Sequence, residues 1–361
     1  MGGTILANLK TLAQTLGLSI TTVSRALDGY SDVSEKTRQR VRAAADAAGY
    51  RPNAAARRLR RQRAEVVALM LPTDPGHFGP PVFLAMLGAC AERLAADGLS
   101  LMIAPVARGQ SELDLCRRLV DGGRVEALIL VRTKRDDERV AFLQDRGIPF
   151  VTHGRTRSPT PHAFVDGDGR EAFARATSLF AADGHSGIAL ISAPGEYNFA
   201  HERRCGWQEA MSALHLPTDL LEETSPTEQG GFDAALRLLA RPQAPTAILC
   251  ATDEMAVGAL RALRCQPAGR DICLIGHDDL PTGAFTDPPL TTMRMAGDAV
   301  GDILAASLLG ALAGEPAEKH QTMLPVEFVL RESHWRRNEP ASASAFAGIS
   351  EPRPSTEEDP R

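Results

Sequence analysis

Residues 16–27 have the sequence LGLSITTVSRAL, in which a glycine separates two segments with the apolar spacing of short helices. The glycine supplies the left-handed backbone conformation that a tight turn between helices requires. Asn8 is placed to cap the first helix and Ser19 the second. A third helix is expected to begin after Ser34 and to end at Gly49. Two short helices joined by a glycine turn and braced by a third predict an all-α helix-turn-helix domain.

Electric charge is distributed unevenly along the 361 residues. The whole chain carries a net charge of -5, yet residues 1–63 contain twelve Lys and Arg against four Asp and Glu. The N-terminal part is therefore at +8 and the remainder at -13. A basic segment attached to an acidic body is the electrostatic pattern of a nucleic-acid-binding module joined to another domain.

Beyond residue 64, short apolar runs alternate with amphipathic helical segments. The expected strands are residues 66–71, 99–104, 127–131, 149–152, 188–192, 247–251 and 272–275. Strands separated by single helices predict parallel sheets. We expect an α/β core of two doubly wound parallel-sheet subdomains, the periplasmic-binding-protein-like arrangement, with a ligand cleft at the carboxyl ends of the strands.

Motifs of common enzyme classes are missing from the sequence, which contains no GxxxxGK[ST], GxGxxG, GxSxG or HExxH. The aspartate pairs at 166/168 and 278/279 are interpreted as strand-end caps or ligand acceptors. Six scattered cysteines without a CxxC pair favour a reducing compartment. The sequence shows neither a secretory signal nor a membrane span. We therefore expect a cytoplasmic binding protein that is not an enzyme and has no cofactor, metal ion or membrane contact.

The segment at residues 16–27 resembles the GVSxxTVSRxLN signature of LacI/GalR-type transcription regulators. VSEKTR at 33–38 and GYRPN at 49–53 resemble two further motifs of that family, in the same order. The resemblance continues through the body to about residue 333, at residues 184–191, 202–207, 252–258, 275–279 and 288–292. It implies a homodimeric repressor of carbohydrate genes, whose partners are a palindromic operator in double-stranded DNA and a sugar effector.

The resemblance also assigns DNA contacts to named residues. The second helix would enter the major groove, with base contacts from Ile20, Thr21 and Arg25. Short hydroxyl side chains would contact phosphates: Ser19, Thr22, Ser24, Ser34 and Thr37. Helix capping is the alternative role of these serines and threonines. Residues 54–63 resemble the family's hinge helix, which would fold only on DNA and reach the minor groove through Asn53, Ala56, Arg57 and Leu59. The alternative for this segment is an ordinary basic linker.

For the effector, the resemblance implies contacts from Arg203 and Asp278, since guanidinium donors and a carboxylate suit the paired hydroxyls of a sugar. Further candidates are Phe83, Arg155, Thr252 and Trp207. Core packing is the alternative for both aromatic residues. Thr252 stands where relatives often carry a sugar-binding asparagine, and Asp253 is predicted to cap the following helix. PFVTHGR at 149–155 resembles the segment of maltose- and α-glucoside-responsive members, which favours an α-glucoside.

The expected domains are a DNA-binding domain at 8–53, a hinge helix or linker at 54–63, a core at 64–335 and a disordered tail at 336–361. Within the core, subdomain 1 is expected at about 64–163 and 293–320, and subdomain 2 at about 164–292 and 321–335. The rival class is a cytoplasmic sugar-binding or sugar-processing protein on the same core. A regulator that depends on a purine or phosphosugar corepressor is the alternative within the class.

Overall fold

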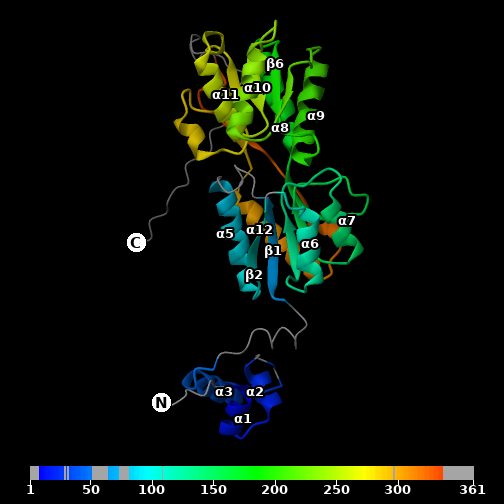
Figure 1. Cartoon of the computed structure of the whole chain (residues 1–361), viewed down its shortest axis with the longest axis vertical. Helices are drawn as coiled ribbons and strands as arrows, with labels where there is room; N and C mark the ends of the chain where they lie inside the picture. Colours follow the sequence, from blue (N-terminus) through cyan, green and yellow to red (C-terminus); the bar gives the residue numbers. More distant parts are fainter. Residues whose placement is uncertain are drawn as a thin grey trace. The chain divides into compact units, whose positions relative to one another are not determined.

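The computed structural model describes residues 8–27, 30, 32–50, 64–72, 81–107, 109–295 and 297–335. The chain separates into two compact units, Met1–Ala64 (unit 1) and Glu65–Arg361 (unit 2) (Figure 1). The predicted hinge residues Asn53, Ala56, Arg57 and Leu59 lie outside the described residues, as do residues 336–361.

Unit 1 is helical. Its described residues form α1 (Leu9–Leu16), α2 (Ile20–Leu27) and α3 (Glu35–Ala47). The side chain of Asn8 caps α1 by accepting a hydrogen bond from the Thr11 amide at 2.9 Å, and Gly17 ends the helix with a φ of 65°. Buried side chains of the three helices and of the loop before α3 form one core: Leu12, Ala13, Val23, Ala26, Val33, Val41 and Ala45. The predicted helix-turn-helix is confirmed.

The first half of unit 2 contains a six-stranded parallel sheet with the order β11-β5-β4-β3-β1-β2. Its strands are β1 (Val66–Pro72), β2 (Ser100–Val106), β3 (Ala127–Leu130), β4 (Phe150–His153), β5 (Ala163–Gly167) and β11 (Gln321–Leu324). Its helices are α5 (Pro81–Ala96), α6 (Glu112–Asp121), α7 (Glu138–Asp145) and α12 (Gly297–Leu312). Side chains of β1 alternate between the two faces of the sheet. Val67 and Leu69 therefore pack against α5 and α12, while Ala68 and Met70 pack against α6 and α7.

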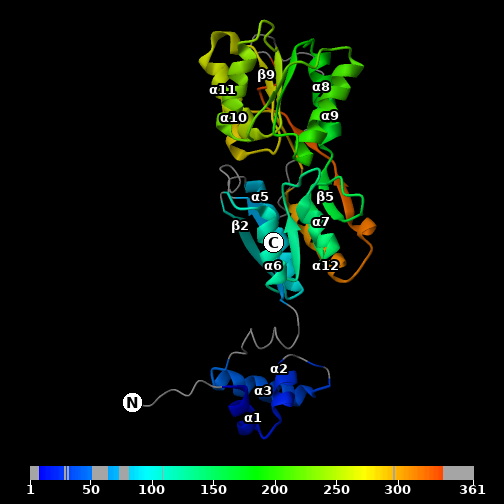
Figure 2. The ribbon, with the colours of Figure 1, turned by 45° about the vertical axis from the view of Figure 1, so that its right-hand side comes forward.

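The second half of unit 2 contains a four-stranded parallel sheet with the order β7-β6-β8-β9. Its strands are β6 (Ile188–Ser192), β7 (Leu221–Glu223), β8 (Ala247–Cys250) and β9 (Cys273–Ile275). Its helices are α8 (Gly169–Ala182), α9 (Asn198–Ala213), α10 (Glu228–Leu239) and α11 (Asp253–Cys265). Figure 2 shows α8 and α9 on one side of this sheet and α10 and α11 on the other. The predicted pair of parallel-sheet subdomains is confirmed.

The chain crosses between the two halves after β5, after β10 and after β11. A separate antiparallel pair runs along two of these crossings: β10 (Thr292–Arg294) and β12 (Glu327–Val329). Residues 164–167 and 321–324, which we expected in the second subdomain, lie in the first sheet, so the expected boundaries are wrong there. The reason is that β11 pairs in parallel with β5, Gln321 opposite Phe164, and extends the sheet at its edge.

Three short 3-10 helices complete the described part of unit 2: η1 (Pro267–Gly269), η2 (Pro281–Phe285) and η3 (Ala317–His320). Among the residues that the structure describes, no helix combines the length and the apolar character needed to cross a membrane.

Candidate functional site

The start of α2 presents an exposed surface. Ser19 caps this helix, since its Oγ accepts a hydrogen bond from the Thr22 amide at 3.0 Å and lies 2.8 Å from the Thr22 hydroxyl. Beside the cap, Ile20 is 47% exposed, and Thr21 is exposed as well. An apolar and a hydroxyl side chain at the N-terminus of an exposed helix match the base-contacting positions of a recognition helix.

Arg25, the third predicted base contact, is held by an ion pair in this structure. Its Nη2 lies 2.6 Å from Asp32 Oδ2, and its Nε donates to Asp32 Oδ1 at 3.2 Å. The guanidinium also stacks 4.5 Å from the centre of the Tyr30 ring. Contact with a base therefore requires Arg25 to exchange its carboxylate partner.

Ser24 is only 4% exposed, which does not fit the phosphate contact predicted for it.

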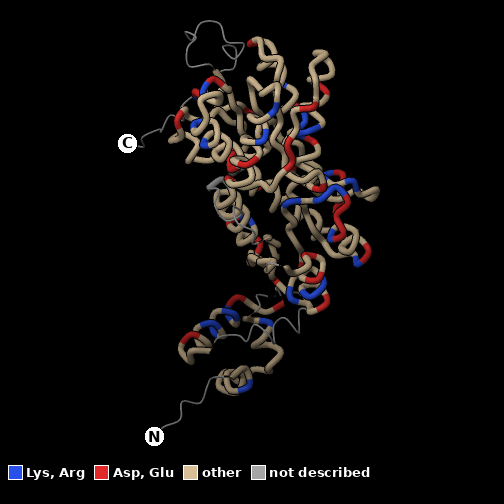
Figure 3. Tube along the Cα trace, turned by 45° about the horizontal axis from the view of Figure 1, so that its top comes forward, with Lys and Arg blue, Asp and Glu red and all other residues tan. Residues whose placement is uncertain are grey.

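The start of α3 repeats the capping arrangement of α2. Ser34 Oγ accepts from the Thr37 amide at 3.3 Å and lies 2.9 Å from the Thr37 hydroxyl. Both helices thus have an exposed serine at the N-terminus, where backbone amides favour an anion such as phosphate. The capping role is present in the structure, and the phosphate role stays a prediction. Basic residues along α3 add positive charge to the same unit (Figure 3): Lys36, Arg38, Arg40 and Arg42.

Unit 2 contains a cavity of about 240 Å³ lined by both of its halves. Its polar lining consists of Arg132, Thr133, His153, Asp166, Glu202, Arg203, Thr252, Glu254, His277 and Asp278. Its apolar lining includes Leu71, Phe83, Met86, Val131, Phe199, Met295 and Val300. Most of the polar side chains lie at or directly after the carboxyl ends of parallel strands, which is the expected place for a ligand in this architecture.

Arg203 and Asp278 come together at the cavity as predicted. Nη2 of Arg203, on α9, lies 3.9 Å from Oδ1 of Asp278, and its Nη1 donates to the carbonyl oxygen of Ala251. Asp278 has a φ of 117°, and its Oδ1 accepts from Nδ1 of His277 at 2.8 Å. Burial acts to raise the pKa of Asp278, but the hydrogen bond from His277 and the positive charge of Arg203 outweigh it and lower the pKa. The carboxylate is therefore charged near neutral pH.

Thr252 lines the cavity and also caps α11, because its Oγ1 accepts from the Met255 amide at 3.4 Å. Asp253, which we predicted as the cap, is fully buried instead. Its two carboxylate oxygens accept from the Thr292 hydroxyl at 2.7 Å and from the Leu280 amide at 2.8 Å. Thus Asp253 fastens the loop after β9 and strand β10 to α11, and the predicted cap was wrong by one residue.

Two other predicted contacts lie behind the cavity wall. Arg155 donates through its Nε to Asp166 Oδ2 at 2.8 Å, and its Nη2 lies 3.5 Å from Glu202. It therefore orients two carboxylates that line the cavity. Trp207 is fully buried in the core of the second half, with its Nε1 donating to the carbonyl of Ile188 at 3.2 Å. The structure thus places Trp207 in the alternative core role and not in the cavity wall.

Sequence reasoning missed several ionisable residues of the cavity: Arg132, His153, Glu202 and Glu254. Glu202 and Glu254 lie inside the motifs that singled out Arg203 and Thr252, so these motifs were the signal that could have found them. Burial raises the pKa of Glu254 to about 7 and lowers the pKa of both His153 and His277, which are therefore neutral at pH 7.

Comparison with known proteins relates both units to one group of regulators. Residues 8–53 match the model of bacterial regulatory proteins of the lacI family, and residues 177–334 match a periplasmic binding protein-like domain. HTH-type transcriptional regulator AglR of Rhizobium meliloti is 38% identical over 340 residues, which cover 90% of this chain and 94% of AglR. RafR of Escherichia coli is 35% identical, covering 84% of this chain and 93% of RafR.

Solved structures of similar proteins include bound complexes. The Lac repressor dimer bound to operator and the anti-inducer ONPF matches 91% of this chain and 99% of its own, with a TM-score of 0.78 and 26% identity. A complex of the transcriptional regulator CelR with cellobiose matches the same shares of the two chains, with a TM-score of 0.68 and 28% identity.

Proposed function

Since the chain belongs to the lacI family of bacterial regulatory proteins and is a DNA-binding transcriptional regulator, we propose that an uncharged sugar in the cavity of unit 2 controls its affinity for DNA. Within this proposal the protein is a homodimeric repressor of carbohydrate genes that acts on a palindromic operator. Twofold symmetry in the protein would match the symmetry of such a site. The proposed location is the cytoplasm, where the DNA is.

The charge of the cavity wall carries the proposal of an uncharged ligand. Four carboxyl groups face the cavity, from Asp166, Glu202, Glu254 and Asp278, and that of Glu254 has a pKa of about 7. They lie beside the guanidiniums of Arg132 and Arg203, and Arg155 pairs with Asp166 and Glu202. The guanidiniums are therefore matched by carboxylates and leave no net positive charge for a phosphate group, which disfavours a phosphosugar. The hydroxyls of a sugar, by contrast, donate to carboxylates and accept from Arg203 without bringing a charge into the cavity.

Two features of the cavity wall support an α-glucoside: its aromatic rings and the segment at residues 149–155. The rings of Phe83 and Phe199 give the wall apolar faces beside its polar groups, a combination typical of small-molecule sites. His153 and Gly154 also line the cavity, and both belong to the segment at 149–155 that resembles α-glucoside-responsive regulators. The cellobiose complex of CelR supports a disaccharide-sized ligand in a similar fold.

Fluorescence anisotropy on labelled DNA from upstream of its own gene tests the proposal. Full-length protein is titrated alone and then with maltose, sucrose, trehalose, glucose 6-phosphate and hypoxanthine. Release from DNA by an uncharged sugar supports the proposal. Binding that needs hypoxanthine or the phosphosugar establishes the corepressor alternative instead. Incubation with each sugar and a product assay separates regulation from turnover, because the proposal includes no chemical conversion.

A further inference from the structure

We propose that the segment after β3 forms a latch with the segment before α9, and that this latch holds the two halves of unit 2 together beside the cavity. The latch is defined as residues 133–135 of the first half and residues 196–198 of the second half. Its effect on ligand affinity rests on the proposed function, whereas the latch itself does not.

The two segments are joined through their backbones. The Asn198 amide donates to the Thr133 carbonyl at 3.0 Å, and the Arg135 amide donates to the Glu196 carbonyl at 2.9 Å. These two bonds flank an antiparallel β-bridge between Lys134 and Tyr197. Residues 133–135 follow β3 of the first sheet, and residues 196–198 lead into α9, which packs on the second sheet. Moving the two halves apart at this point therefore breaks both bonds.

Side chains reinforce the latch. The ammonium group of Lys134 lies 3.2 Å from Oε1 of Glu196 in the opposite segment. The hydroxyl of Thr133 donates to the carbonyl of Arg155 at 2.9 Å, which ties the same segment to the chain after β4. The latch therefore has a contact across the halves and a fixed support within the first half.

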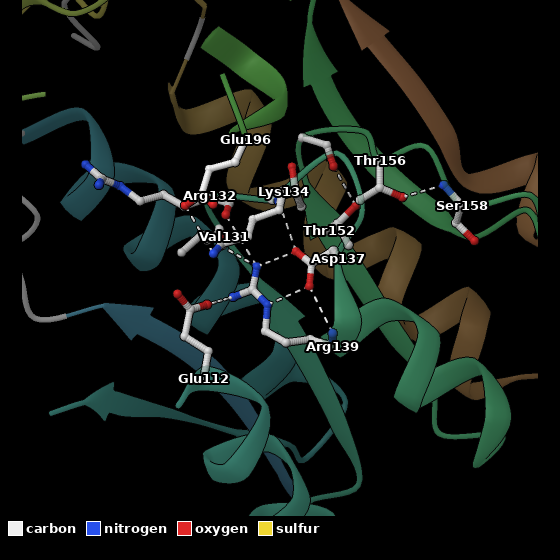
Figure 4. Close-up of polar contacts among 12 residues, drawn as sticks. Glu112, Val131, Arg132, Lys134, Asp137, Arg139, Thr152, Thr156, Ser158 and Glu196 are labelled. Atoms are coloured by element: carbon white, nitrogen blue, oxygen red, sulfur yellow. Dashed lines mark hydrogen bonds and ion pairs between the residues drawn. The ribbon is translucent and has the colours of Figure 1, made fainter. Parts of the chain in front are cut away.

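A buried arginine positions the first-half side of the latch (Figure 4). Nη2 of Arg139 donates to the carbonyls of Val131 and Arg132 at 3.3 and 3.4 Å. The same guanidinium contacts Asp137 at 2.7 Å and Glu112 at 2.5 Å, and Arg139 is only 3% exposed. A charged group at this depth requires such partners, so the peptide groups it contacts are held in one arrangement.

The latch adjoins the cavity on both sides. Residues 131–133 line it from the first half, and Phe199, Glu202 and Arg203 line it from α9, which begins at Asn198. A ligand that touches both walls is stabilised when the latch is closed. By linkage, closing the latch then raises ligand affinity by the same factor by which the ligand favours closure.

Substitution of Asn198 isolates the latch. Asn198 is the first residue of α9, a position that accepts proline, and Tyr197 before it has an extended backbone with φ -73° and ψ 132° that proline tolerates. Asn198→Pro removes the amide that donates to Thr133. The matched control Asn198→Ala removes the same side chain and keeps that amide. Glu196→Gln, at an exposed side chain, removes only the ion pair and serves as a second variant.

Hydrogen–deuterium exchange of the full chain without ligand tests the latch. We expect amides of residues 131–137 to exchange about 2- to 10-fold faster in Asn198→Pro than in Asn198→Ala, as the loss of one hydrogen bond implies. Glu196→Gln should accelerate exchange relative to the unmodified protein at low salt, and the acceleration should be smaller at high salt. Equal exchange in all three variants overturns the latch.

Calorimetric titration with maltose, sucrose and trehalose tests the coupling to the cavity. We expect affinity to fall about 2- to 10-fold in Asn198→Pro relative to Asn198→Ala. Faster exchange with unchanged affinity overturns the coupling. If the unmodified protein binds none of the sugars, the proposed function fails, and the exchange experiment alone then decides for or against the latch.

Discussion

Replacing Asp253 by asparagine changes how the stability of unit 2 depends on pH. Burial, with a further contribution from Asp278, raises the pKa of Asp253 from 3.8 to about 7. The folded state therefore holds the proton more tightly than the unfolded state does. A carboxyl of this kind favours folding most below pH 4, and stability falls as the pH rises toward 7.

The difference between the two pKa values of Asp253 corresponds to about 4 kcal/mol of unfolding free energy, of which about 2.5 kcal/mol develops between pH 5 and pH 8. Asparagine cannot ionise, so Asp253→Asn lacks this contribution. At pH 5 the variant should be about 1–3 kcal/mol less stable, because its amide replaces only one of the two acceptors that face Thr292 and Leu280. At pH 8 this deficit should be close to zero or reversed in sign.

Urea unfolding of both proteins from pH 5 to pH 8 measures this effect, with the fluorescence of the buried Trp207 as the signal. The expected result is a difference in unfolding free energy that shrinks by about 2.5 kcal/mol as the pH rises. Parallel stability curves for the two proteins would refute the reasoning, because Asp253 would then have the same pKa in both states.

Three further substitutions test the sites. Arg25→Ala should weaken operator binding by about 1–3 kcal/mol in anisotropy titrations and spare salt-dependent binding to unrelated DNA; an equal loss on both DNAs contradicts base reading. Asp278→Asn should keep operator affinity but weaken sugar binding about 10- to 100-fold in calorimetry, the range of a charge-assisted hydrogen bond, and an unchanged sugar response sinks this assignment. Trp207→Ala should lower unfolding free energy by about 3–5 kcal/mol without a selective loss of sugar affinity in the molecules that remain folded; a selective loss would return Trp207 to the cavity.

Local patterns in the sequence predicted much of the architecture. The apolar spacing around Gly17 predicts a helix-turn-helix. This prediction succeeds because the three helices of unit 1 contact one another within a short stretch of chain. The alternation of strands and helices specifies parallel sheets, and their carboxyl ends gather residues far apart in sequence. The family resemblance assigned Thr252 and Asp278 to one effector site, and both residues line the cavity.

Other features depend on distant contacts that no local pattern encodes. The edge position of β11 follows from its pairing with β5, more than 150 residues earlier in the sequence. Trp207 and Arg203 lie four residues apart on α9, yet one packs in the core and the other lines the cavity. Arg155 carries the charge of a ligand contact, but the carboxylate of Asp166 accepts hydrogen bonds from its backbone amide and its Nε. In each case the nearest neighbour in space decides the role.

The ion pair between Arg25 and Asp32 would give the predicted base contact of Arg25 a competitor within the protein. Both side chains are about half exposed, so the pair contributes no more than about 1 kcal/mol and opens readily. On unrelated DNA no base contact would replace the ion pair, so the pair would stay closed. A guanine at the right step offers two acceptors in place of the carboxylate. If Arg25 contacts a base as predicted, the free energy of this ion pair would be subtracted from operator binding alone, and Asp32 would lower the margin over unrelated DNA by no more than about 1 kcal/mol.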